Sequence, residues 1–208
     1  NNLKMGTVGK VIEGVEVKIA EDGEILCKGP NVMMGYYKEE KMTQEVMSGD
    51  YFHTGDIGEV DDEGFLKITD RKKEMFKTSG GKYIAPQVIE SQMKQSLFIE
   101  QIMVVGAGRR MATAIIQPNT DHVKNWLNEN GIKCNSLSKA VQEPTLKKVI
   151  EAEVEHHNQN FGSWEQVKKI ELTPDEWSID GGHLTPTMKL KRKVISEKYS
   201  NLIDNMYN

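Results

Sequence analysis

Alternating apolar and polar residues run through the first third of the chain and predict β-strands there. Val15, Val17 and Ile19 alternate with charged residues at the period of a half-buried strand. Asp22-Gly23 then predicts a tight hairpin turn into a return strand over residues 25–28. Further strands are expected over residues 52–53, 57–60 and 65–69, with a turn at 61–64 and a short helix over 39–46. The pattern therefore indicates a β-rich unit over residues 1–70.

After residue 70 the apolar spacing becomes helical, with short apolar strands between the helices. Pro86 and Pro144 each suit the first turn of a helix, because a proline there loses no hydrogen bond. The apolar residues on one face of these helices are Val88, Ile89, Met93 and Leu97 in the first, and Leu146, Val149, Ile150 and Val154 in the second. Thr120 is expected to cap a third helix that Gly131 closes. Strands are expected over 102–105, 112–117 and 167–172, and a last amphipathic helix over 191–206. The fold class is therefore α+β.

Composition narrows the class of protein. The 208 residues suggest one or two domains, and 38% hydrophobic with 28% charged residues describes a soluble globular protein. No apolar run is long enough to span a bilayer and no signal peptide precedes the first strand, so we expect a cytoplasmic protein. The net charge of -4 argues against nucleic acid as a partner. Cys27 and Cys134 are expected to be reduced thiols.

The methionines and histidines of the chain suggest no special chemistry. Methionines at positions 5, 33, 34, 42 and 47 are expected to fill a core. His53, His156 and His157 have no neighbouring cysteine or carboxylate at the spacing of metal ligands, so no metal site is expected.

Two charged residues near the end of the β-rich unit are candidates for binding. Asp56 lies in the Gly-containing turn Thr54-Gly55-Asp56, where a carboxylate can accept two hydrogen bonds from a vicinal diol such as a ribose. A solvated turn aspartate is the commoner alternative. The planar fork of Arg71 suits a hydroxyl pair or a phosphate, while the alternative is a surface arginine beside Asp70.

Further candidates lie beyond residue 71. Gly80-Gly81 would let the backbone approach a ligand closely, or form an ordinary turn. Lys189 lies in a Gly- and Pro-rich loop and could reach a phosphate as a point charge, although its basic run to Lys193 also suits a solvated helix start. Lys72 and Lys73 are expected to form only a solvated junction. These signals alone name no function.

Four segments together carry a resemblance to a known family. Residues 23–37 are similar to its "GEI…GP…GYY" segment and residues 51–56 to its "WFHTGD" segment, with Tyr51 where tryptophan is usual. Residues 70–86 resemble its "DRxK…GGxxIxP" hinge segment, and residues 184–192 its terminal lysine motif. In this order the segments resemble the adenylate-forming enzyme superfamily. The "LTPTxKLKR" form of the last motif is typical of long-chain fatty-acid–CoA ligases.

The resemblance implies a domain organisation. Residues 1–70 would be the β-rich end of the large N-terminal adenylation domain, and residues 71–208 the C-terminal lid domain, with the hinge at Lys73. The phosphate loop and acyl pocket of such enzymes would precede Asn1, so the remainder of the N-terminal domain would be a partner. The isolated chain is therefore expected to be inactive.

The resemblance also implies roles for individual residues. Asp56 and Arg71 would hold the ribose hydroxyls of ATP, and Ile68 would touch the adenine. Gly80, Gly81 and Lys82 would face the pantetheine arm of CoA or a phosphate. Lys189 would bridge the α-phosphate and the acyl carboxylate as the catalytic residue. Mg²⁺ would accompany ATP, with ligands outside this chain.

The function that follows is an acyl-CoA synthetase that converts fatty acid, ATP and CoA to acyl-CoA, AMP and pyrophosphate through an acyl-adenylate. Two alternatives stay open. One is another carboxylate-activating enzyme of the superfamily, and the other is a non-catalytic binding module that retains the lid fold. Membrane-surface association of the parent protein and a homodimer are also left open, as are the acyl chain length and the oligomeric state.

Overall fold

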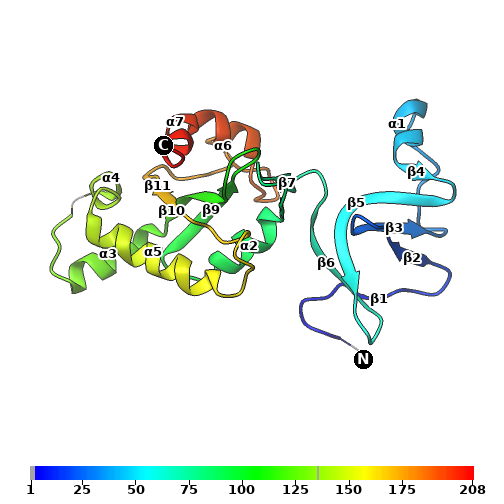
Figure 1. The fold of residues 1–208 in the computed structure, drawn as a ribbon, viewed down its shortest axis with the longest axis horizontal. Coiled ribbons are helices and arrows are strands. Elements are labelled where there is room, and N and C mark those ends of the chain that lie inside the picture. Colours follow the sequence, from blue (N-terminus) through cyan, green and yellow to red (C-terminus); the bar gives the residue numbers. More distant parts are fainter. Residues whose placement is uncertain (1–2, 135) are drawn as a thin grey trace. The chain divides into compact units, whose positions relative to one another are not determined.

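A computed structural model describes residues 3–134 and 136–208. The chain divides into two compact units, Asn1–Met75 and Phe76–Asn208, each with its own sheet (Figure 1). The division follows Met75, whereas the sequence predicts it after residue 70. Residue 70 lies inside a strand of the first unit, β6, which runs over Phe65–Arg71. The assignment of the two units to an N-terminal domain end and a lid stays a prediction.

The first unit is an antiparallel sheet with one short helix. Its strands are β1 (Gly9–Lys10), β2 (Glu16–Ile19), β3 (Glu24–Lys28), β4 (Met47–Ser48), β5 (Tyr51–Val60) and β6, and its helix is α1 (Glu40–Glu45). The order is β1-β6-β5-β3-β2, with β4 also paired to β5. The separate strands expected over 52–53 and 57–60 are one strand. Gly58 allows this, because a Cβ there would lie 2.4 Å from the carbonyl oxygen of Lys67.

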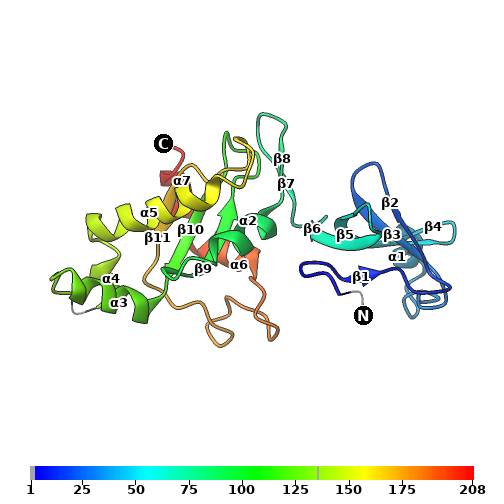
Figure 2. The same ribbon diagram turned by 90° about the horizontal axis from the view of Figure 1, so that it is seen from below.

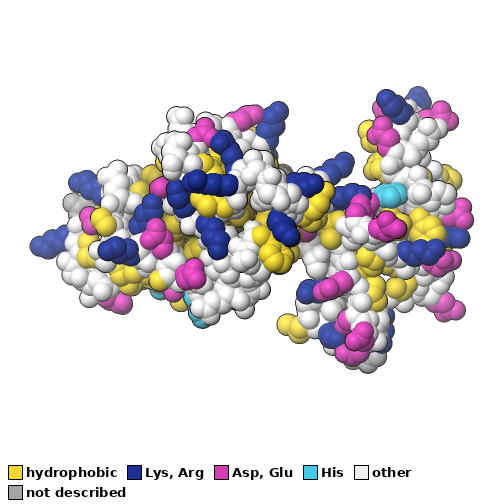
Figure 3. Space-filling view, in the orientation of Figure 1, with side chains coloured by type: hydrophobic (Ala, Val, Ile, Leu, Met, Phe, Trp, Pro, Cys, Tyr) yellow, Lys and Arg dark blue, Asp and Glu magenta, His cyan; other side chains and the backbone are white. Residues whose placement is uncertain are grey.

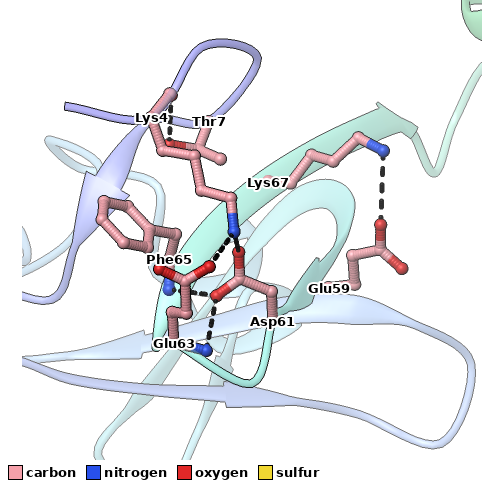
Figure 4. A network of polar contacts seen from close by, with 7 residues as sticks. All are labelled: Lys4, Thr7, Glu59, Asp61, Glu63, Phe65 and Lys67. Atoms are coloured by element: carbon pink, nitrogen blue, oxygen red, sulfur yellow. Dashed lines mark hydrogen bonds and ion pairs between the residues drawn. The ribbon is translucent and has the colours of Figure 1, made fainter.

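The turn between β5 and β6 is fixed by charged side chains (Figure 4). Asp61 Oδ1 accepts hydrogen bonds from the backbone amides of Glu63 and Phe65, at 3.0 and 2.9 Å. Lys4 Nζ lies 2.7 Å from carboxylate oxygens of both Asp61 and Glu63. The expected turn at 61–64 therefore forms, and the segment before β1 is tied to it.

The first unit buries few apolar side chains. Ile25 and Phe65 are buried, but Met5 and Met34 are fully exposed and Met42 is 46% exposed. The expectation that these three methionines fill a core is therefore wrong. Figure 3 shows hydrophobic side chains on the visible surface of this unit. A single small sheet covers too little surface to enclose them, so much apolar surface of this unit stays open.

The second unit is a sheet with helices on both faces (Figure 2). Its strands are β7 (Phe76–Lys77), β8 (Tyr83–Ile84), β9 (Ile99–Val105), β10 (Thr113–Pro118) and β11 (Ile170–Leu172). Its helices are α2 (Pro86–Met93), α3 (Thr120–Glu129), α4 (Leu137–Ala140), α5 (Pro144–Asn158), α6 (Arg192–Lys198) and α7 (Ser200–Asn205). The order is β11-β10-β9, with β10 parallel to β11 and antiparallel to β9, while β7 and β8 form a separate hairpin.

Alternation along β10 explains the two helical layers. Ala114 and Ile116 pack with apolar residues of α2, α3 and α5, whereas Ile115 packs with Ile195 of α6 and with Met206 beyond α7. A strand presents successive side chains to opposite faces, so this central strand has to be apolar throughout. All six residues of β10 are buried.

Several helix ends differ from the sequence-based expectation. Helix α2 ends at Met93, and Leu97 is 71% exposed rather than part of an apolar face. Asn119, not Thr120, caps α3, and its side chain accepts a hydrogen bond from the amide of His122. The expected helix over 191–206 is two helices, because Tyr199 leaves helical geometry at φ -104° and ψ 21°. Helix α4 was not expected. Among the described residues, no helix has both the length and the apolar character that crossing a membrane requires.

Candidate functional site

The structure pairs two of the predicted site residues on adjacent strands. Asp56 of β5 lies opposite Arg71 of β6, and Arg71 Nε is 2.9 Å from Asp56 Oδ1. The side chain of Asp56 is 22% exposed and that of Arg71 is 52% exposed. A carboxylate and a guanidinium are thus held together at an accessible surface, where each keeps hydrogen-bonding capacity for a polar ligand.

The turn that presents Asp56 rests on a buried carboxylate, Glu24 of β3. Gly55 has a φ of +73°, and its amide donates to Glu24 Oε1 at 3.0 Å. Glu24 Oε2 lies 2.7 Å from His53 Nδ1 and 2.8 Å from Lys72 Nζ. Burial alone would raise the pKa of Glu24, but the hydrogen bonds from His53, Lys72 and Gly55 together lower it. The turn is therefore built on a charged support.

Lys72 belongs to this support. Its ammonium bridges Glu24 and Asp22, at 2.8 and 2.6 Å, and its backbone amide donates to the carbonyl oxygen of Gly55 at 2.8 Å. The hydrogen bonds to Asp22 and Glu24 raise the pKa of Lys72. The expectation of a merely solvated residue here is wrong, because the return of β6 alongside β5 brings this ammonium against two carboxylates.

Ile68 and Lys73 flank this pair in sequence. Ile68 is 45% exposed and pairs with Gly58, and the strand register shifts between Ile57 and Gly58. Lys73 is exposed in the turn that follows β6, just before the division between the units. The adenine contact of Ile68 and the hinge role of Lys73 stay predictions.

Gly80, Gly81 and Lys82 form an exposed turn between β7 and β8. The amide of Thr78 donates to the carbonyl of Lys82 at 2.9 Å, which closes the turn, and Gly81 has a φ of +80°. A Cβ at Gly80 would meet only Thr78 Oγ1, at 3.9 Å, so the backbone there is open. Lys82 Nζ lies 5.2 Å from the ring centre of Trp164, which is half-exposed and which the sequence analysis did not single out.

Lys189 lies on a closed hairpin ahead of α6. Leu184 and Leu190 form an isolated antiparallel bridge. The amide of Thr185 donates to the carbonyl of Lys189 at 2.8 Å, and the amide of Lys189 donates to Thr185 Oγ1 at 3.1 Å. Met188 takes a left-handed conformation, with φ +61°. The side chain of Lys189 is exposed, so its ammonium projects from a loop of defined backbone.

The basic run after Lys189 is only partly solvated. Lys191 and Lys193 are exposed, but the side chain of Arg192 is 21% exposed and donates to the buried carboxylate of Glu90 at 2.5 Å. The interpretation of the whole run as a solvated helix start is therefore wrong at Arg192.

The structure brings these predicted residues into three groups. Asp56 and Arg71 form a pair in the first unit, and the Gly80 turn and the Lys189 hairpin are separate features of the second unit. Two cavities of about 540 and 620 Å³ in the second unit are lined by none of the predicted site residues. Among the described residues, no three or more His, Cys, Asp or Glu side chains are grouped to hold a metal ion.

Comparison with known protein families shows which family the chain belongs to. The model of the AMP-binding enzyme C-terminal domain matches residues 74–208. The chain therefore belongs to the AMP-binding enzyme C-terminal domain family. This membership confirms the predicted resemblance to adenylate-forming enzymes.

Individual proteins that are similar in sequence to this chain include long-chain fatty-acid–CoA ligases. Long-chain-fatty-acid–CoA ligase FadD15 of Mycobacterium tuberculosis is 40% identical over 209 residues, which cover 100% of this chain and 35% of that protein. Human long-chain-fatty-acid–CoA ligase 1 is 37% identical over 201 residues, or 94% of this chain and 29% of that protein. The chain thus spans about a third of the length of these relatives and is similar to their C-terminal region.

Solved structures confirm the mixed α+β fold. The adenylation domain of a carboxylate reductase from Mycobacterium chelonae matches with a TM-score of 0.76 at 20% identity, over 97% of this chain and 32% of that one. O-succinylbenzoate CoA synthetase from Bacillus subtilis, in complex with AMP, matches with a TM-score of 0.62 at 23% identity, over 91% of this chain and 35% of that one.

Proposed function

We propose that this chain is the C-terminal part of an ATP-dependent fatty-acid–CoA ligase. The enzyme would join a fatty acid to ATP, giving acyl-AMP and pyrophosphate, and then transfer the acyl group to CoA, releasing AMP. The observation that carries the proposal is the Asp56–Arg71 pair, because an accessible carboxylate beside a guanidinium fits a ribose. The choice of a fatty acid rests on the names of the two relatives.

Nucleotide binding would use the first unit. The Asp56 carboxylate would accept hydrogen bonds from the two ribose hydroxyls, while Arg71 holds that carboxylate in place and offers its own donors. Glu24 keeps the backbone turn fixed beneath them, so the carboxylate is oriented before ATP arrives. Ile68 offers an exposed apolar side chain on the same strand as Arg71 for the adenine ring.

The second unit would supply the groups for each half-reaction. Negative charge builds on the α-phosphate and the acyl carboxylate during adenylation, and the ammonium of Lys189 would stabilise it there. The open backbone at Gly80 and Gly81, with Lys82 beside it, fits the thin pantetheine arm of CoA or a phosphate. Lys73 would be the pivot that presents one group and then the other.

The remaining expectations belong to the same proposal. Mg²⁺ would enter with ATP, held by ligands from outside this chain. The exposed apolar residues of the first unit support its packing against the remainder of an N-terminal domain. We place the parent protein in the cytoplasm, which cell fractionation tests. Membrane-surface association and homodimerisation stay predictions.

The deciding experiment assays the full-length gene product for pyrophosphate release from ATP with palmitate, acetate, benzoate or amino acids. Release that depends on palmitate, followed by acyl-CoA formation, supports the proposal. Release with a different acid favours another carboxylate-activating enzyme. No release with any acid, while the protein still binds ATP, favours the non-catalytic module.

The 208-residue chain alone should be inactive. It spans about a third of the relatives' length. The phosphate loop and acyl pocket that the family resemblance implies would lie outside it. With ATP and palmitate, its pyrophosphate release should stay at the level of a protein-free blank. Turnover clearly above that level would contradict this expectation.

A further inference from the structure

A buried carboxylate joins three elements of the second unit. Glu90 of α2 is 6% exposed. Its Oε1 accepts from the backbone amide of Val104 in β9 at 2.7 Å, and its Oε2 accepts from Arg192 Nη2 at 2.5 Å. Arg192 Nη1 in turn donates to the carbonyl oxygen of Val104 at 3.3 Å. The three residues form a closed ring, which we call the Glu90 latch.

The latch uses backbone groups at an open sheet edge. Strand β9 is the edge strand of the order β11-β10-β9. Val104 lies opposite Ala114, whose amide is turned away from β9 and donates to the carbonyl of Lys169. Two residues that face each other in an antiparallel pair point their backbone N–H and C=O groups either both toward or both away from the partner strand. The amide and carbonyl of Val104 therefore point away from β10, toward the open edge. Glu90 and Arg192 therefore satisfy groups that the sheet leaves unpaired.

The latch also fixes the end of the Lys189 hairpin. Arg192 is the first residue of α6 and follows Lys189 by three positions. Between them, the amide of Lys191 donates to the carbonyl of His183 at 2.8 Å, and Leu190 bridges to Leu184. The hairpin is thus closed at its base, and the chain leaving it is held to α2 and β9 through one guanidinium.

We propose that Glu90 and Arg192 are positioning residues for Lys189. This inference rests on the proposed function, in which the Lys189 ammonium acts during adenylation. In this proposal, Glu90 and Arg192 do not contact the substrate themselves. The latch fixes the start of α6, directly after the hairpin, against α2 and β9, and hence sets where the ammonium can reach. A displacement of about 1 Å in such a group can cost roughly 100-fold in rate.

The first test is Glu90→Gln in the full-length gene product. The glutamine keeps an acceptor for the Val104 amide but loses the charge that holds Arg192. Adenylation should slow by roughly 10- to 100-fold, while conversion of supplied acyl-AMP and CoA to acyl-CoA changes by less than about twofold. Arg192→Lys, which keeps the charge but lacks the fork, should show the same selectivity with a smaller loss.

A matched control breaks a different ion pair of the same unit. Lys147 of α5 and Glu171 of β11 lie 2.9 Å apart, a helix-to-sheet pair at the opposite edge of the sheet from β9. Glu171→Gln should leave both half-reactions unchanged. If Glu171→Gln slowed adenylation as selectively as Glu90→Gln, the latch would have no special connection to Lys189.

The decisive measurement combines Glu90→Gln with Lys189→Ala. If the latch acts through the ammonium, Glu90→Gln should slow adenylation no further once that ammonium is gone. A further loss in that background, or equal slowing of both half-reactions by Glu90→Gln, overturns the inference. If Glu90→Gln does not fold, Arg192→Lys is judged by the same criteria. A Lys189→Ala variant without selective loss would instead overturn the role of Lys189 in the proposed function.

Discussion

Asp56 and Arg71 face each other across two strands, with Arg71 Nε 2.9 Å from Asp56 Oδ1. The pair is ordered before any ligand binds, because the buried carboxylate of Glu24 holds the amide of Gly55 and the ammonium of Lys72 on either side. A ligand that bonds to Asp56 therefore meets a carboxylate whose conformational freedom is already reduced.

Replacing Asp56 by alanine in the full-length enzyme should raise the KM for ATP. Hydrogen bonds to a charged acceptor contribute about 1.5–3 kcal/mol, so a rise of roughly 10- to 100-fold is expected. The KM for the fatty acid should change little. Steady-state kinetics with each substrate varied in turn measures both constants.

Asp50→Ala is the control for this variant, since Asp50 is also an ion-paired aspartate of the first unit but is 78% exposed. It should leave both constants unchanged. An unaltered KM for ATP in Asp56→Ala would show that Asp56 is only a turn residue.

Lys189→Ala should slow acyl-AMP synthesis by roughly 100- to 1,000-fold, the usual loss when one donor to a developing charge is removed. It should spare the conversion of supplied acyl-AMP and CoA, which the proposed function assigns to the Gly80 turn. Lys191→Ala should do much less, because Lys191 lies at the N-cap position of α6, at the base of the hairpin, and its side chain makes no capping hydrogen bond. Single-turnover rates of the two half-reactions decide this. A larger loss of acyl-AMP synthesis in Lys191→Ala than in Lys189→Ala would show that Lys189 is not the catalytic lysine.

Most elements of the fold could be predicted from local pattern. The alternation at Val15, Val17 and Ile19 gives β2, and Pro86 and Pro144 open α2 and α5 as expected. These signals work because the period of the apolar residues and the missing amide of proline act within a few residues. Asp56 and Arg71 could be singled out for the same reason, since each lies in a short local motif; their binding role stays a prediction.

The burial and ion pairing of two carboxylates could not be predicted, because their partners are distant in sequence. Glu90 looks like a polar position on an amphipathic helix, and its partner Arg192 is 102 residues away. Glu24 looks like the solvent side of a strand, yet its neighbours come from β5 and the turn after β6. Glu90 stands between Ile89 and Ser91, and Glu24 between Gly23 and Ile25, so neither local pattern marks a buried carboxylate. Tyr199, where the last helix is interrupted, likewise has side-chain partners that are distant in sequence, Asp175 and Trp177.

Lys73→Pro should separate the two half-reactions in the opposite way to Lys189→Ala. The backbone bonds of this turn are donated by Lys72, Glu74 and Met75, so a proline at 73 leaves those donors in place. Its ring fixes φ at about -65° and would hinder a pivot. Adenylation should largely survive while acyl transfer to CoA fails.

Lys73→Ala is the matched variant, because it removes the same side chain without restricting φ, and it should behave like the wild type. Half-reaction rates of the two variants test the hinge. Equal loss of both half-reactions in Lys73→Pro, or acyl transfer at the wild-type rate, would argue against a pivot at this position.

The last prediction concerns the buried imidazole just ahead of the Lys189 hairpin. His183 is 6% exposed, and its Nε2 lies 3.1 Å from Lys198 Nζ. Lys198 is itself paired with Asp175 at 2.8 Å. Burial lowers the pKa of His183, and the Lys198 charge lowers it further, against an opposing effect of Asp175. A protonated imidazole would point an N–H at an ammonium, so the folded chain favours neutral His183.

This shift makes the stability of the second unit depend on pH. Below the ordinary histidine pKa of about 6.5, the unfolded chain binds a proton at His183 that the folded chain resists. The contribution of His183 is therefore complete above about pH 6.5 and declines as the pH falls. In His183→Gln, which keeps an acceptor for Lys198 but does not titrate, the melting temperature should fall less between about pH 7.5 and about pH 5.5 than in the wild type.

All three tryptophans, Trp126, Trp164 and Trp177, lie in the second unit, so their fluorescence reports its unfolding in the 208-residue chain. The exposed His156 provides the control, since His156→Gln should keep the wild-type slope. An unchanged slope in His183→Gln would mean that this imidazole titrates alike in the folded and unfolded chains.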